Sequence, residues 1–194
     1  QLSKYGITTE VTATPRTSCE RYTFPAGEGH IILNLGQGLT NESGAMVRRV
    51  SSTEVEGMKL LGTFCYTTQA VFPIYFVMRV SHEPSTAGPW KFQPKLQGVE
   101  SAWSPDDGTY KLYENYHREI AGDDIGYRFS YDDLGEGEQV TVRMGVSFVS
   151  IENARMNLEA EQQGKTFDQL RAEATAQWDR DLGRIRIEGG TPDQ

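Results

Sequence analysis

Alternating apolar and polar residues dominate the first three quarters of the chain and predict β-strands. The clearest alternation covers residues 140–150 (VTVRMGVSFVS), and a period of two places one face of a strand against a core. Residues 30–35 are nearly all apolar and lie between glycines, which predicts a strand buried between two layers. Further strands are predicted at residues 5–14, 20–24, 46–50, 59–66, 74–81 and 126–131.

A loop-rich stretch separates the predicted strands at residues 126–131 and 140–150 from all the earlier ones. Residues 83–125 are rich in Pro, Gly, Ser and Asp, so we expect one or two edge hairpins on long loops, which usually make contacts or carry function. Trp90 and Trp103 lie in this stretch, and their rings are our candidates for stacking against a sugar. The alternative is that they pack against the core, the commoner fate of aromatic residues at a sheet edge.

The apolar period changes after Ser150. Apolar residues then fall at helical spacing, and Gly164 divides the segment into two predicted helices. Thr166 suits the N-cap of the second helix, because Gln169 occupies the N3 position of a capping box. Gly183 is expected to end that helix, and residues 184–188 alternate as a short strand.

Strands followed by terminal helices predict a mostly β fold, an antiparallel β-sandwich with a C-terminal helical segment. We expect residues 1–150 to form the sandwich and residues 151–194 to form a helical tail with a short strand. The formal charge of −8 over 194 residues disfavours a nucleic-acid partner, because an acidic chain repels phosphates. No apolar run reaches the ~20 residues of a membrane-spanning helix, so no membrane span is expected.

Residues with reactive side chains are scattered and predict no self-sufficient active site and no metal site. Cys19 and Cys65 allow either one disulfide or two buried thiols. His30 begins a strand, where we expect a structural role. His82 lies next to Glu83 and could form a catalytic pair with it, but neighbouring His and Glu residues occur often by chance. The acidic pairs favour turns over catalysis, because Asp side chains bond to nearby backbone amides in turns; they are Asp106–Asp107, Asp123–Asp124 and Asp132–Asp133.

Several ordered blocks resemble the N-terminal domain of family 92 glycoside hydrolases. These blocks are YGITTEVTATPR from Tyr5, RYTFP from Arg21, HIILNLG from His30 and GVSFVSIENA from Gly145, with Phe167, Trp178 and Leu182 behind them. The resemblance implies a supersandwich-like domain that packs on a C-terminal (α/α)6 barrel. It also implies that the family's sandwich starts upstream of Tyr5, so that this piece lacks its first strands.

The family's activity follows as an expectation from the same resemblance. Its members are calcium-dependent, inverting exo-α-mannosidases that trim mannose-containing glycans, and many are secreted or periplasmic in bacteria. The general acid, the base and the calcium ligands belong to the barrel, so no catalytic residue and no metal ligand is assigned to this chain. The resemblance therefore implies a calcium cofactor in the parent enzyme's catalytic domain.

Two hypotheses follow for the chain itself. In the first, the sandwich supports the barrel and lines the substrate cleft, with Glu152, Asn153, Asn157 and Trp178 at the domain interface. In the second, the chain is a freestanding carbohydrate-binding or structural module without catalytic activity.

Overall fold

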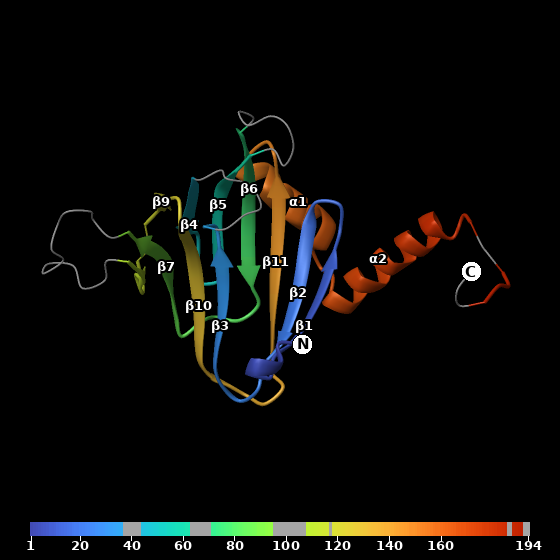
Figure 1. Cartoon of the computed structure of the whole chain (residues 1–194), viewed down its shortest axis with the longest axis horizontal. Coiled ribbons are helices and arrows are strands. Elements are labelled where there is room, and N and C mark those ends of the chain that lie inside the picture. Colours follow the sequence, from blue (N-terminus) through green and yellow to red (C-terminus); the bar gives the residue numbers. More distant parts are fainter. Residues whose placement is uncertain (37–43, 63–70, 95–107, 117, 186–187, 192–194) are drawn as a thin grey trace, which may run out of the picture.

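Two antiparallel sheets face each other in the computed structural model (Figure 1). The structure describes residues 1–36, 44–62, 71–94, 108–116, 118–185 and 188–191. The first sheet has seven strands in the order β1-β2-β11-β6-β5-β4-β9, and the second has four in the order β3-β10-β7-β8. The strands are β1 (Thr8–Ala13), β2 (Thr17–Thr23), β3 (Gly27–Asn34), β4 (Ala45–Arg49), β5 (Glu54–Gly62), β6 (Val71–Val80), β7 (Thr86–Gln93), β8 (Thr109–Leu112), β9 (Ile120–Gly122), β10 (Ile125–Leu134) and β11 (Gln139–Ser147).

The core lies between the two sheets and is centred on β10. Tyr127, Phe129 and Tyr131 alternate along this strand and are all buried, because a period of two directs them to one face. They pack in one cluster with buried valines of the facing sheet, such as Val55 and Val142. The predicted antiparallel sandwich is therefore confirmed, and none of the helices in the described residues is long and apolar enough to cross a membrane.

The strand β3 differs from its prediction as a doubly buried strand. Ile31 is buried, whereas His30, Ile32 and Asn34 are exposed. The strand forms an edge of the second sheet, so its outward side chains face solvent although the sequence is nearly all apolar. The structural role predicted for His30 inside a buried strand was therefore wrong.

The loop-rich stretch contains more regular structure than its composition predicts. The strand β7 pairs with β10 on one side and with β8 on the other, although it includes Gly88 and Pro89. Gly88 is required there because a Cβ atom would lie 2.1 Å from the carbonyl oxygen of Tyr113. The expected edge hairpin exists as β7–β8, but β7 itself is an interior strand. Asp132 and Asp133 also lie in a strand, β10, and not in a turn.

Two helices follow the sandwich, as the sequence predicts. Helix α1 (Ile151–Gln162) is capped by Ser150, and helix α2 (Phe167–Leu182) begins with the capping box of Thr166 and Gln169. The strand predicted at residues 184–188 is wrong for the described residues Arg184, Ile185 and Glu188, none of which is in a strand. The other two residues of that prediction lie outside the described part of the chain.

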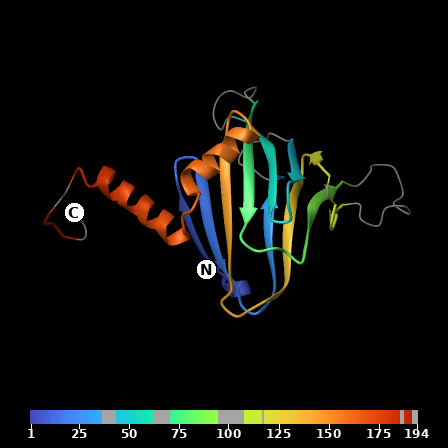
Figure 2. The ribbon, with the colours of Figure 1, turned by 180° about the vertical axis from the view of Figure 1, so that it is seen from behind.

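Helix α1 lies across the outer face of the seven-stranded sheet, and α2 points away from it (Figures 1 and 2). Gly145 of β11 makes the close approach of α1 possible. A Cβ atom at this position would lie 2.3 Å from the carbonyl oxygen of Ala154 and 2.8 Å from the Cβ of Leu158. Ala154 and Leu158 in turn bury Val77 of β6, so the helix seals this part of the sheet.

We predict that Gly145→Ala lowers the free energy of unfolding by about 1–3 kcal/mol, because the added methyl group must push α1 off the sheet. Urea unfolding at equilibrium measures the change. The matched control is Gly135→Ala, whose Cβ would meet nothing closer than a flexible carboxylate oxygen of Glu138 at 3.4 Å. Equal stabilities of the two variants would contradict the close packing of α1.

Candidate functional site

The surface around α1 and α2 is the part of the molecule where the sequence places its interface residues. Its centre is a charge network around two buried glutamates. Arg155 of α1 donates from Nη1 to Glu54 and from Nη2 to Glu56, both at 2.6 Å. Arg79 also pairs with Glu54, and Arg48 pairs with Glu56 at 2.6 Å. Burial lowers the pKa of Arg155, but its hydrogen bonds to the two carboxylates and their negative charge outweigh this and raise the pKa overall.

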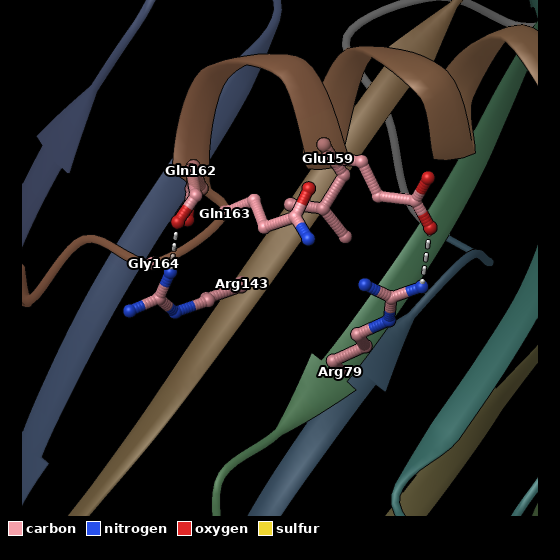
Figure 3. Close-up of a pocket in the computed structure, with 7 residues that line it drawn as sticks. Arg79, Arg143, Glu159, Gln162, Gln163 and Gly164 are labelled. Atoms are coloured by element: carbon pink, nitrogen blue, oxygen red, sulfur yellow. Dashed lines mark hydrogen bonds and ion pairs between the residues drawn. The ribbon is translucent and has the colours of Figure 1, made fainter.

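The C-terminal end of α1 is held by a second arginine, shown in Figure 3. Arg143 of β11 donates to the carbonyl oxygen of Gln162 at 2.9 Å and to that of Lys165. A cation at this end of a helix complements its dipole. A cavity of about 200 Å³ lies beside this contact, between Arg143 and the Arg79–Glu159 ion pair. Both arginines there are already paired, so we interpret the cavity as part of a structural clamp.

Glu161 fastens the same helix to the β1–β2 turn. Its carboxylate accepts hydrogen bonds from the Thr14 hydroxyl, from the backbone amide of Arg16 at 3.1 Å and from Nε of Arg16 at 2.6 Å. Burial raises the pKa of Glu161, but these hydrogen bonds outweigh it, so the net pKa is lowered. The ionised carboxylate therefore stabilises the docked helix.

The first turns of α2 pack on the outer face of β1 and β2. Phe167 and Leu170 form a buried cluster with Cys19, and the guanidinium of Arg21 lies 4.3 Å from the centre of the Phe167 ring. Arg21 also pairs with Asp168 at 3.1 Å. Cys19 is a free thiol whose pKa is raised by burial, so it acts as a small apolar residue. Its candidate disulfide partner Cys65 lies outside the described residues.

The apolar stripe of α2 continues beyond the part that the sheet covers. Phe167, Leu170, Ala174, Trp178 and Leu182 recur at helical spacing. The first two are buried, whereas Trp178 is 65% exposed and Leu182 is 69% exposed. A groove of about 220 Å³ separates Trp178 from the β1–β2 turn. The second half of the helix therefore presents an apolar face that nothing in the described structure covers.

More exposed apolar side chains lie where β11 leads into α1. Phe148 is 67% exposed and Val149 is 71% exposed, and the neighbouring Met156 of α1 is exposed too. The Phe148 ring packs on that of Phe72 at the start of β6, with centroids 5.8 Å apart. We call the exposed residues of these two regions the apolar tail surface: Phe148, Val149, Met156, Trp178 and Leu182. Exposed apolar patches are typical of interaction sites.

Trp90 lies on the opposite side of the molecule, on the outer face of the four-stranded sheet. It lines a groove of about 420 Å³ with Ile32, Asn34, Tyr110, Leu112 and Arg128. The Tyr110 ring stands edge-on to the indole at 5.3 Å and its hydroxyl donates to Asp124 at 3.0 Å. Rings beside polar groups are compatible with the predicted sugar contact, which stays a prediction. Trp103, the other candidate, lies outside the described residues.

His82 has different partners from those its sequence position suggests. Its Nδ1 lies 2.8 Å from the Ser81 hydroxyl, and its Nε2 lies 3.8 Å from a carboxylate oxygen of Glu138. All three side chains are at the surface, and the Ser81 hydroxyl accepts a hydrogen bond from the backbone amide of Thr141. Among the described residues no group of three His, Cys, Asp or Glu side chains could hold a metal ion.

A family model decides where the chain belongs. The model of the glycosyl hydrolase family 92 N-terminal domain matches residues 1–147, more than half of the chain. The chain belongs to glycosyl hydrolase family 92. The model of the family 92 catalytic domain matches residues 153–194, so α1 from Asn153 onward and all of α2 fall in a segment similar to that catalytic domain.

Solved family 92 structures are similar over nearly the whole chain. A family 92 α-mannosidase from Bacteroides thetaiotaomicron, solved in complex with mannoimidazole, gives a TM-score of 0.77 at 25% identity and covers 97% of this chain and 23% of that one. An inverting family 92 mannosidase from the same organism gives 0.74 at 22% identity, over 96% and 22% of the two chains, and shows the fold alone. No curated protein sequence matches the chain. The chain thus spans about a quarter of the length of these solved enzymes.

The predicted interface residues of this family 92 chain divide into two kinds. Asn157 is buried and its side-chain amide donates to the carbonyl oxygen of Val146 at 2.8 Å, while Asn153 donates to the capping hydroxyl of Ser150 from its backbone amide at 3.1 Å and from its side-chain amide at 3.4 Å. Both hold α1 in place within this chain. Glu152 is exposed in the first turn of α1, where backbone and Ser150 hydrogen bonds lower its pKa. Glu152 and Trp178 are therefore the two of the four that are exposed, and Asn153 is half-buried.

The sequence prediction missed Phe148, Val149, Met156 and Leu182 as members of the apolar tail surface. The signal was present for Leu182, which continues the helical period of Phe167, Leu170, Ala174 and Trp178. Phe148 continues the alternation of β11 instead, so its pattern predicted a buried strand residue. Its exposure depends on where the facing layer ends, which a local pattern does not contain.

We predict that Glu161→Gln lowers stability at pH 7 by about 1–2 kcal/mol, because the uncharged amide accepts weaker hydrogen bonds. The lowered pKa of Glu161 means that its contribution is present above the unfolded value of about 4.5 and is lost as the pH falls through the folded value. The difference between the wild type and the variant should therefore shrink towards pH 3, which urea unfolding at several pH values measures. Glu159→Gln is the matched control on the same helix, since Glu159 makes a single 3.4 Å ion pair at the surface. A difference that stays constant with pH would contradict this account.

Proposed function

We propose that this chain is the non-catalytic sandwich part of a family 92 α-mannosidase, where it supports the catalytic domain and borders the substrate cleft. The observation that carries the proposal is the half-covered stripe of α2. The sandwich buries Phe167 and Leu170, and the same stripe continues as the exposed Trp178 and Leu182 within the segment similar to the family's catalytic domain. A helix shared in this way fixes the position of one domain on the other.

The energetics support a second binding partner for the stripe. Full burial of a large apolar side chain contributes about 1.5–3 kcal/mol. Covering the exposed Trp178, Leu182 and Phe148 would therefore contribute several kcal/mol of binding free energy. The base of α2 is anchored by the ion pairs of Arg21 and Arg171 with Glu10 and Asp168. The catalytic domain would therefore meet a preformed surface and lose little conformational entropy on docking.

We also propose the parent enzyme's reaction, the hydrolysis of terminal α-linked mannose in glycans with inversion at the anomeric carbon. The relatives that support it are solved family 92 α-mannosidases. Inversion requires two carboxyl groups ~6.5–9.5 Å apart with room for a water molecule, and we assign both groups to the catalytic domain. A calcium ion takes six to eight oxygen ligands, and we assign the calcium that the family resemblance implies to the catalytic domain as well. A secreted or periplasmic location is part of the same proposal.

The alternative of a freestanding carbohydrate-binding module has less support. A separate module would have no reason to continue into a segment similar to a catalytic domain or to carry an uncovered helical stripe. The groove beside Trp90 is the one feature that favours it, and this groove lies on the face opposite to α1 and α2.

We predict that the intact native gene product hydrolyses a synthetic α-mannoside, and that EDTA abolishes turnover until calcium is restored. The release of the aglycone in the presence of calcium, EDTA, and EDTA followed by excess calcium measures this. Turnover that is insensitive to EDTA would contradict the calcium assignment. The absence of turnover in all three conditions would contradict the mannosidase proposal.

We predict that Trp178→Ala destabilises the intact gene product by about 2 kcal/mol, the value of one buried large side chain. The same change in the 194-residue chain should stay within about 0.5 kcal/mol, because Trp178 is mostly exposed there. Thermal unfolding of both proteins gives the comparison, and Arg180→Ala on the same turn is the control. Equal effects of Trp178→Ala in the two proteins would mean that the stripe is not an interdomain contact.

A further inference from the structure

The outer face of the four-stranded sheet carries an aromatic groove, on the side of the molecule away from α1 and α2 (Figure 1). The groove crosses all four strands, from Ile32 and Asn34 of β3 to Tyr110 and Leu112 of β8. Three strand spacings give it a length of about 14 Å, which exceeds one hexose ring. Its volume of about 420 Å³ falls within the ~300–1,000 Å³ of typical ligand sites. The groove therefore has room for a short stretch of a chain-like ligand.

Trp90 forms the floor of the groove. A Cβ atom at Gly126 of β10 would lie 2.4 Å from two carbon atoms of the indole, so the ring occupies the space that a side chain there would fill. The register pairs Trp90 with Gly126 and Gly126 with Asn34, which places the ring and the Asn34 amide in one row across the sheet. Asn34 Oδ1 accepts a hydrogen bond from the amide of Gly36 at 2.8 Å. Its side-chain N–H groups have no partner in the described part of the chain.

A polar pair lies on each side of the indole along the strand direction. In the register, Arg128 is opposite the residue two positions before Trp90, and Tyr110 is opposite the residue two positions after it. Arg128 donates to a carboxylate oxygen of Glu114 at 3.1 Å, and the Tyr110 hydroxyl donates to Asp124 at 3.0 Å. Each pair combines hydrogen-bond donors with acceptors, so the ring is bordered by both kinds of group.

These groups favour a neutral ligand that has one apolar face and hydroxyl groups around it. The cation at the groove is already matched by a carboxylate, and the formal charge of −8 opposes an anion, so a phosphate or a nucleotide is disfavoured. The negative face of an indole attracts C–H groups. Hydroxyl groups both donate and accept, so they can use either member of the flanking pairs. A pyranose ring combines these properties, with C–H groups on one face and hydroxyl groups at its rim.

We propose that the groove is an accessory, non-catalytic binding site for a carbohydrate chain, in which one hexose stacks on Trp90 and its hydroxyl groups bond to Asn34, Arg128 and Tyr110. The ligand is a mannose-containing glycan, and this choice rests on the proposed function, whereas the carbohydrate site itself rests on the groove. The groove lies on the face opposite to α1 and α2. A glycan held there is bound away from the proposed interdomain cleft, which raises the effective concentration of a branched substrate at the enzyme.

Affinity electrophoresis of the 194-residue chain through gels that contain a branched α-linked mannan tests the site. We expect the mannan to retard the chain and an equal amount of dextran not to do so. Trp90→Ala should weaken the retardation at least about 10-fold, because it removes the ring on which the sugar stacks. Tyr110→Phe keeps both rings and should weaken it by about 3-fold, since it removes one hydroxyl group. Trp178→Ala is the matched control, an exposed tryptophan outside the groove, and should not change it.

Three outcomes would overturn the proposal. The first is a wild-type chain that the mannan does not retard, and the second is equal retardation of the wild type, Trp90→Ala and Tyr110→Phe. The third is equal retardation by dextran and mannan, which would overturn the assignment to mannose-containing glycans.

Turnover by the intact gene product separates an accessory site from the substrate cleft. Trp90→Ala should lower the release of mannose from dilute mannan at least about 3-fold more than it lowers turnover of a small synthetic α-mannoside, because the small substrate does not reach both sites at once. Equal losses on the two substrates would overturn the proposal by placing Trp90 in the cleft. Retardation by mannan without turnover of either substrate would support the carbohydrate site and contradict the mannosidase proposal alone.

Discussion

The contact between Arg155 and the two glutamates of β5 is the interaction on which the rest of the arrangement depends. Glu54 and Glu56 are side by side on one face of the strand and are both buried. Each carboxylate also pairs with an arginine of the sheet, Arg79 or Arg48, and Arg155 of α1 adds the cation that bridges the two. This bridge, together with the Arg143 contact at the C-terminal end of the helix, holds α1 on the sheet.

Because α1 is docked on the sheet, the boundary between the two domains in the sequence differs from the boundary in the folded molecule. The two family models meet between residues 147 and 153, where β11 ends and α1 begins. The helix beyond that point nevertheless buries Val77 and clamps its C-terminal end on Arg143. The first part of the catalytic-domain segment is thus physically part of the sandwich. Only the second half of α2 extends beyond it.

The sequence predicted the elements whose signals are local. Thr166 and Gln169 lie three residues apart, and the capping box they predict is present; the alternation of β11 is likewise contained in one window. Strand β7 was missed because Gly88 and Pro89 resemble a turn, whereas the glycine is set by a close approach of the chain at Tyr113. That approach joins segments far apart in sequence, so no window contains it.

The candidate site shows the same division. The stripe of α2 was predictable as a period, but its change from buried to exposed depends on where the sheet ends. The exposure of His30 depends equally on β3 being at an edge, and the partner of Glu54 is about a hundred residues away at Arg155. Pairing of this kind is decided by the fold and has no signature near either residue. The family resemblance supplied what these patterns lacked, because it placed the helices next to a second domain.

The most direct test of the central claim is the accessibility of the second half of α2 in the 194-residue chain and in the intact gene product. A cysteine introduced by Leu182→Cys can be titrated with a thiol reagent in both proteins, with Arg180→Cys as the control on the same helix. The account predicts that labelling at position 182 is fast in the 194-residue chain and at least about 100-fold slower in the intact product, because local opening must expose a buried thiol first. Equally fast labelling at position 182 in both proteins would show that the catalytic domain does not cover the stripe.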